Sequence, residues 1–126
     1  MDENPILEHF NAPYHRGPLL TATHSGYFRS AACGDEVTLY AEVRDAKIVA
    51  TGFVAAGCMV CQAAASILCE HIDGQDISAL KDLTPEKMLQ LIGVPLTPRR
   101  QQCGLLPLYA LRKAVPFDPI DKSECK

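Results

Sequence analysis

The sequence predicts an α+β domain in which helices pack on one face of a small antiparallel sheet. Two observations predict this fold. The strand-forming segments come before most of the helix-forming segments, an order typical of α+β domains. The length of 126 residues suits one domain with a sizeable core that needs no disulfide framework. We therefore expect a single domain over residues 1–126, with a loose tail over 116–126, where Pro116 and Pro119 lie.

Three segments have the character of strands. Residues 21–28 are moderately β-prone and predict an edge strand. Residues 36–43 alternate apolar and polar side chains, as a half-buried strand does, and residues 47–55 are rich in Ile, Val, Thr and Phe. Only residues 44–46 separate these last two segments, so they predict a β-hairpin.

Three helices are predicted by their boundary signals. Residues 4–10 can form a short helix that Pro13 would end. Residues 59–72 predict a longer helix, closed by a left-handed residue at Gly74. Residues 84–93 begin with Thr-Pro-Glu, an N-cap followed by proline at the first helical position, and end at a glycine.

The last helix is predicted over residues 105–115, with an apolar face. Pro107 sets its start, because a proline inside a helix cannot donate to the carbonyl four residues back, here that of Cys103. If the helix begins near Gly104, the proline falls in its first turn, where it costs little. Cys103 is then expected in a loop or at the helix start, exposed enough for chemistry.

Charge and hydropathy exclude several classes of partner. The formal charge of −3 and the lack of a lysine–arginine run give no footprint for nucleic acid or for a membrane surface. The longest uncharged stretches, such as residues 48–65, are broken by glycines and do not predict a membrane span. Residues 1–5 lack the features of a signal peptide. We expect a cytoplasmic protein without nucleic-acid or membrane partners.

Six cysteines are unusual for such a chain, and without signs of export they indicate metal binding, redox chemistry or core packing. Cys33 and Asp35 flank a glycine, so a thiolate and a carboxylate can face one ion. Cys58 lies between a strand and a helix, where the helix N-terminus favours a thiolate. Cys103 follows Arg99 and Arg100, whose charges favour a thiolate too and can steady an anionic group.

The remaining cysteines and the histidines give weaker signals. Cys61 forms a C-x-x-C motif with Cys58 and could be a redox partner, a fourth ligand or a core residue. Cys69 lies about 16 Å further along the helix, too far to share one metal, and is expected in the core. Cys125 lies in the tail. Among the histidines, His24 is the candidate ligand, nine residues before the first of the predicted cysteine ligands.

These motifs, Cys33-Gly34-Asp35, Gly57-Cys58 and Cys103 before Leu105-Leu106, together resemble the IscU/NifU/SufU family of iron–sulfur scaffolds. The resemblance extends over residues 6–115. It implies a scaffold that is not an enzyme, which receives sulfur from a cysteine desulfurase, builds a transient [2Fe–2S] cluster and passes it to apo-proteins. It also implies that the three cysteines are the sulfur ligands and that Asp35 is the nearby carboxylate. A carboxylate is a harder and more exchangeable ligand than a thiolate, which suits a cluster that must leave.

The sequence departs from the family pattern at three places. Gln102 occupies the position of an IscU-type histidine, which leaves the fourth ligand to Asp35, or else to Cys61 or His24. Residues 94–100 keep prolines and basic residues but not the Leu-Pro-Pro-Val-Lys motif, so binding of a specialised Hsp70 chaperone is not expected. Arg100 agrees with SufU-type members, yet the chain lacks room for their insertion between the second and third cysteines.

Two other functions stay open. The first is a SufU-like sulfur acceptor, in which Zn²⁺ occupies Cys33, Asp35, Cys58 and Cys103 and keeps the thiolates ready for sulfur transfer. The second is a thiol–disulfide oxidoreductase that uses the C-x-x-C pair, although a hairpin rather than a βαβ unit precedes that pair.

Overall fold

The structure is a computed structural model that describes residues 5–14, 16–31 and 34–115. The predicted ligand Cys33 and the predicted tail 116–126, with Cys125, lie outside the described residues. Over the part of the chain that is described, none of the helices is long and apolar enough to cross a membrane.

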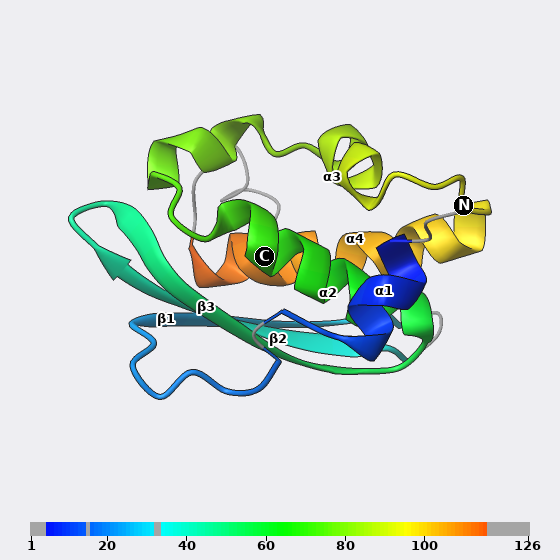
Figure 1. Ribbon diagram of the computed structural model, residues 1–126, viewed down its shortest axis with the longest axis horizontal. Coiled ribbons are helices and arrows are strands. Elements are labelled where there is room, and N and C mark those ends of the chain that lie inside the picture. Colours follow the sequence, from blue (N-terminus) through cyan, green and yellow to red (C-terminus); the bar gives the residue numbers. More distant parts are fainter. Residues whose placement is uncertain (1–4, 15, 32–33, 116–126) are drawn as a thin grey trace.

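A three-stranded antiparallel sheet forms one layer of the molecule (Figure 1). Its order is β1 (His24–Arg29), β2 (Glu36–Arg44) and β3 (Lys47–Ala56), with β2 in the centre. The turn between β2 and β3 has left-handed φ angles of +53° at Asp45 and +62° at Ala46, which matches the twist of a two-residue hairpin. The predicted hairpin and the edge position of β1 are confirmed.

Helices cover one face of this sheet. The two long ones, α2 (Met59–Ile72) and α4 (Pro98–Ala114), lie directly on it, α2 against β3 and α4 against β1 and β2. Their apolar side chains, such as Leu68 and Leu108, close the core with inward-facing residues of the strands, such as Leu39 and Phe53. The predicted α+β class, with helices on one sheet face, is therefore confirmed.

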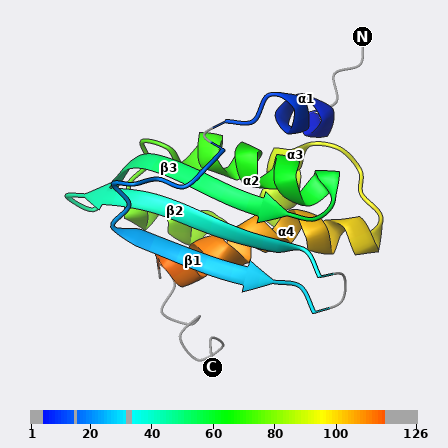
Figure 2. The same ribbon diagram turned by 90° about the horizontal axis from the view of Figure 1, so that it is seen from below.

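Smaller helices complete the molecule. They are α1 (Pro5–Asn11), beside α2; the 3-10 helix η1 (Ile77–Asp82); and α3 (Pro85–Ile92), beyond α2 and α4 from the sheet. The segment from α1 to β1 pairs with the free edge of β3, where the Gly17 amide donates to the Phe53 carbonyl at 2.6 Å, and then crosses the outer face of the sheet (Figure 2). Sequence analysis identified α1, α2 and α3 but not η1.

The predicted start of the last helix is wrong. Helix α4 begins at Pro98, where the Thr97 hydroxyl accepts a hydrogen bond from the Arg100 amide at 3.3 Å, and it continues through Pro107. A proline inside a helix costs about 3 kcal/mol, and the buried apolar face of α4 offsets this cost through its packing on β1, β2 and α2. As a result Cys103 lies inside the helix, with only 5% of its surface exposed, and not in an exposed loop.

Candidate metal centre

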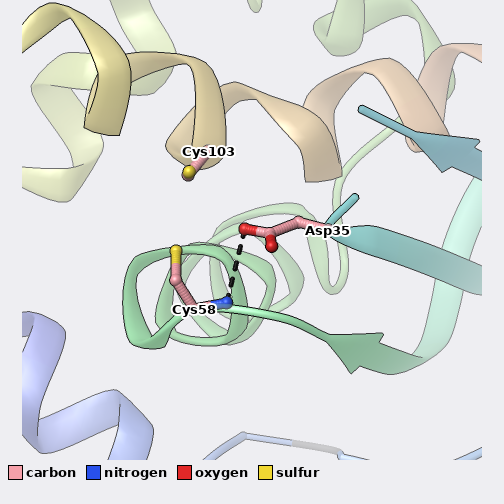
Figure 3. Close-up of side chains that lie close together, drawn as sticks. All are labelled: Asp35, Cys58 and Cys103. Atoms are coloured by element: carbon pink, nitrogen blue, oxygen red, sulfur yellow. Dashed lines mark hydrogen bonds between the residues drawn. The ribbon is translucent and has the colours of Figure 1, made fainter. Parts of the chain in front are cut away.

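Three of the four predicted ligands lie together at one end of the sheet (Figure 3). One ligand atom each from Asp35, Cys58 and Cys103 lies within 4.8 Å of the other two. The first residue directly precedes β2, the second directly precedes α2, and the third belongs to α4. The fourth predicted ligand, Cys33, is outside the described residues, so its place at the site stays a prediction.

Asp35 is held by the connection between β1 and β2. Within this loop the Ser30 amide donates to the Asp35 carbonyl and the Gly34 amide donates to the Ser30 carbonyl, both at 2.8 Å. Gly34 has a left-handed φ of +79°, which glycine adopts without strain. The carboxylate that results is only 7% exposed and points from the sheet toward the two cysteines.

Cys58 is the N-cap residue of α2, and its side chain makes no capping hydrogen bond. Its backbone amide donates to Oδ2 of Asp35 at 3.3 Å, which joins the two ligands directly. The preceding turn is fixed by Gln62, whose side-chain amide donates to the Gly57 carbonyl at 3.0 Å. The sulfur is therefore free of the capping role that a serine or threonine would have here, and it faces the other two donors.

A hollow of about 420 Å³ opens beside these three donors. Besides them its walls include Thr97, Arg99 and Arg100 from the beginning of α4. The arginines are exposed, so the site combines two sulfurs and a carboxylate inside with positive charge at its rim. Such a rim attracts an anionic group that approaches the sulfurs.

The donor set fits a thiophilic metal. Thiolate and carboxylate are established ligands of zinc, and thiolates hold iron–sulfur clusters. Donors around a tetrahedral zinc lie roughly 3.3–3.8 Å apart when the bonds are about 2.0–2.3 Å long. The observed limit of 4.8 Å is longer than this, so side-chain rotations would have to bring the three donors closer together around one ion.

The other candidate ligands lie elsewhere. Cys61 and Cys69 have no exposed surface and belong to the core, as expected for Cys69. Burial raises the pKa of the Cys69 thiol to about 12, which keeps it protonated and unreactive. His24 lies at the start of β1, with its Nδ1 2.8 Å from the Thr23 hydroxyl, and Gln102 is exposed on α4. Within the described ranges, none of Cys61, Cys69 and His24 joins the group of possible ligands.

Sequence analysis did not predict the place of two residues at the site, although Gly57 is part of the Gly57-Cys58 motif. Thr97 lines the hollow, and its Thr-Pro pair is the same helix-start signal that was used for Thr84 and Pro85. The second is Gly57, which has a φ of +137° and at which an added Cβ would lie 2.4 Å from Cγ of Asp35. No local pattern in the sequence predicts that Gly57 lies beside Asp35.

Comparisons with known proteins identify the family of the chain. A family described as NifU-like N terminal domain matches residues 1–119. The chain belongs to this NifU-like family. The resemblance inferred from the motifs is thereby confirmed.

Two relatives are named as iron–sulfur cluster assembly scaffold proteins. IscU of Thermotoga maritima is 35% identical over 86 residues, which are 68% of this chain and 61% of that protein. IscU 1 of Archaeoglobus fulgidus is 28% identical over 115 residues, or 91% of this chain and 74% of that protein. The match thus spans less than two thirds of the length of the Thermotoga protein.

Solved structures show the same fold. A candidate iron–sulfur cluster assembly scaffold for the SUF system from Fervidobacterium islandicum superposes with a TM-score of 0.68 at 23% identity, and the match covers 90% of this chain and 96% of that one. The N-terminal part of a nitrogen-fixing NifU-like protein from Brucella abortus gives 0.71 at 20% identity, covering 91% and 92%. These similarities confirm the predicted IscU/SufU-like architecture.

Proposed function

We propose that this protein is a scaffold on which an iron–sulfur cluster is assembled and from which it is passed on. The observation that carries the proposal is the convergence of Asp35, Cys58 and Cys103 within 4.8 Å, from three separate segments, in a chain of the NifU-like family. Relatives named as assembly scaffolds support it. The described site offers donors for a metal, and the names of these relatives support a carrier rather than an enzyme.

In this proposal the cluster is cargo and the side chains divide its handling. Cys58, Cys103 and the predicted ligand Cys33 bind iron through sulfur, and Asp35 supplies the fourth, more exchangeable donor. The sulfur comes as a persulfide from a cysteine desulfurase. Each sulfane sulfur must take up two electrons from an external reductant to become cluster sulfide. The completed [2Fe–2S] cluster then moves to an apo-protein through the open side of the hollow.

The experiment that tests this proposal is anaerobic reconstitution with ferrous iron, cysteine and a cysteine desulfurase, followed by visible absorption and Mössbauer spectroscopy. A labile [2Fe–2S] signal is expected, and it should disappear in Cys33→Ser, Cys58→Ser and Cys103→Ser. Cys61→Ala is the matched control, because Cys61 lies one helical turn from Cys58 but belongs to the core. A protein that forms no cluster under these conditions contradicts the scaffold function.

The second candidate is the zinc-containing sulfur acceptor. Two observations favour it: Gln102 is exposed, so no histidine-like donor joins the site from that position, and Arg100 lines the hollow beside Cys103. In this case zinc binds tightly, no cluster forms, and the protein accelerates the desulfurase by accepting its persulfide sulfur. The same Cys61→Ala variant tests the oxidoreductase hypothesis, which requires that this variant lose all disulfide-reducing activity.

A further inference from the structure

The strand register places Gly57 directly opposite Asp35. In the β2–β3 ladder Glu36 pairs with Ala56, so the next antiparallel pair beyond the ladder is Asp35 and Gly57. Side chains of opposite residues lie on the same face of a sheet. Any side chain at position 57 would therefore point to the same place as the Asp35 carboxylate.

The two positions are closer than an ordinary cross-strand pair. A Cβ atom on Gly57 would lie 2.4 Å from Cγ and Oδ1 of Asp35 and 2.8 Å from its Cβ, whereas cross-strand Cβ atoms are usually about 4.5–5.5 Å apart. Gly57 has a φ of +137°, a conformation that glycine adopts without strain. The carboxylate thus occupies the volume of the side chain that residue 57 lacks.

The same turn presents the Cys58 amide to the carboxylate. That amide donates to Oδ2 of Asp35 at 3.3 Å, on the side next to the Cys58 sulfur. The space left by the missing side chain of Gly57 and the hydrogen bond from the Cys58 amide together define where the carboxylate lies beside the open hollow. Held there, it is within 4.8 Å of both sulfurs.

We propose that Gly57 is a positioning residue for the metal site. Because it has no side chain, the Asp35 carboxylate has room beside Cys58 and Cys103, where it serves as the fourth and displaceable donor. This inference rests on the proposed function for the identity of the cargo. Its first test is made without metal and does not depend on that function. A bulkier residue at position 57 expels the carboxylate, breaks its bond to the Cys58 amide and leaves the cysteines with one donor fewer.

The metal-free test uses NMR of the Cys58 amide. We expect Gly57→Ala to shift this amide upfield and to speed its hydrogen exchange, and Asp35→Gly to do the same. Gly74→Ala is the matched control, since Gly74 follows α2, also has a left-handed φ (+86°), and has nothing within 4 Å of its added Cβ. It also places a side chain at a positive φ, but without touching the site. An unchanged Cys58 amide in a folded Gly57→Ala protein overturns the inference.

Cobalt(II) binding, followed by its sulfur-to-metal and ligand-field absorption, measures the consequence for the site. Gly57→Ala is expected to weaken Co²⁺ binding about 10–100-fold, the usual effect of losing a group that orients a ligand. In an Asp35→Gly background the atoms that clash with residue 57 are absent. If Gly57 acts on the metal site through Asp35, the same substitution should there change the Co²⁺ affinity less than about twofold.

Equal losses in the two backgrounds would show that Gly57 acts on the cysteines through the backbone, which overturns the positioning role. A wild-type protein that binds no Co²⁺, but whose Cys58 amide responds as expected, would contradict the proposed metal site while leaving the Gly57–Asp35 contact established. Thermal unfolding of every variant separates backbone strain, which both glycine substitutions introduce, from the effect on the site.

Discussion

Replacing Gly26 by alanine tests whether the close contact between β1 and α4 sets the geometry of the metal site. Gly26 faces α4 from the middle of β1. An added Cβ would lie 2.2 Å from the Ala110 carbonyl oxygen and 2.4 Å from the Ala114 amide nitrogen. Both are backbone atoms, so no side-chain rotation relieves the contact. The helix has to move away from the strand by at least about 1.2 Å, because ordinary van der Waals contact begins near 3.4 Å and the shortest distance is 2.2 Å.

The size of the effect follows from this displacement. Overpacking a well-packed core costs about 1–3 kcal/mol, and a contact with rigid backbone belongs at the upper end, near 3 kcal/mol. Without the clash, alanine would stabilise a strand by about 0.5–1 kcal/mol relative to glycine. The clash and the intrinsic strand preference therefore predict opposite signs for the change in the free energy of unfolding. For a domain of this size 3 kcal/mol corresponds to a decrease of about 12 °C in melting temperature.

Thermal and urea unfolding measure the stability, and Co²⁺ titration measures the site. Because α4 carries Cys103, its displacement should weaken metal binding as well as lower the melting temperature. Ser25→Ala is the control, since this residue is exposed and should change the free energy of unfolding by less than about 0.5 kcal/mol. A Gly26→Ala protein that melts at or above the wild-type temperature would refute the reasoning.

Three further predictions concern single side chains. In the native protein, iodoacetamide should modify the half-buried Cys58. Burial raises the pKa of the Cys69 thiol to about 12, so Cys69 should react only after unfolding. Mass spectrometry of the alkylated peptides checks this, and equal rates for the two cysteines would contradict it. Tyr14 donates to the Asp73 carboxylate at 2.6 Å, and this hydrogen bond is the main cause that raises the Tyr14 pKa to about 12. The unfolded tyrosine loses its proton near pH 10, so this contribution to stability is present below pH 10 and is lost between about pH 10 and 12. In urea unfolding, Tyr14→Phe should therefore be less stable than the wild type by about 1–2 kcal/mol at pH 8, and this difference should shrink between pH 10 and 12. Pro107→Ala restores a helical amide donor, worth about 3 kcal/mol, but removes buried ring carbons worth about 2 kcal/mol. Urea unfolding should therefore show an increase in the free energy of unfolding of about 1 kcal/mol. A clear decrease would show that packing of the ring dominates.

Local signals in the sequence were sufficient for most elements. Alternation in residues 36–43, the short connection at residues 44–46 and the Thr84-Pro85 cap each depend on a few neighbouring residues, and each predicted its element correctly. The boundaries of α2 were predicted at Met59 and Ile72, since Cys58 and Asp73-Gly74 mark its two ends.

The errors arose where distant contacts decide the structure. Pro107 argued locally against a helix from residue 98 onward, but burial of α4 against the sheet outweighed the missing donor. For the same reason the exposure of Cys103 could not be predicted. At the site, residue types and order were enough to select Asp35, Cys58 and Cys103, whereas the contact of Asp35 with Gly57 depends on a strand register that no local pattern gives.

The three described donors belong to segments that only the folded chain brings together: the β1–β2 connection, the start of α2 and the body of α4. A bound ion is therefore also a cross-link between the sheet and both of its covering helices. Free metal at 100 times its dissociation constant would stabilise the folded chain by about 2.7 kcal/mol. By the same linkage, a protein that binds the chain better when α4 has moved off the sheet would lower its affinity for the ion. Such a partner would release a bound ion without touching a sulfur atom, by loosening the contact between β1 and α4.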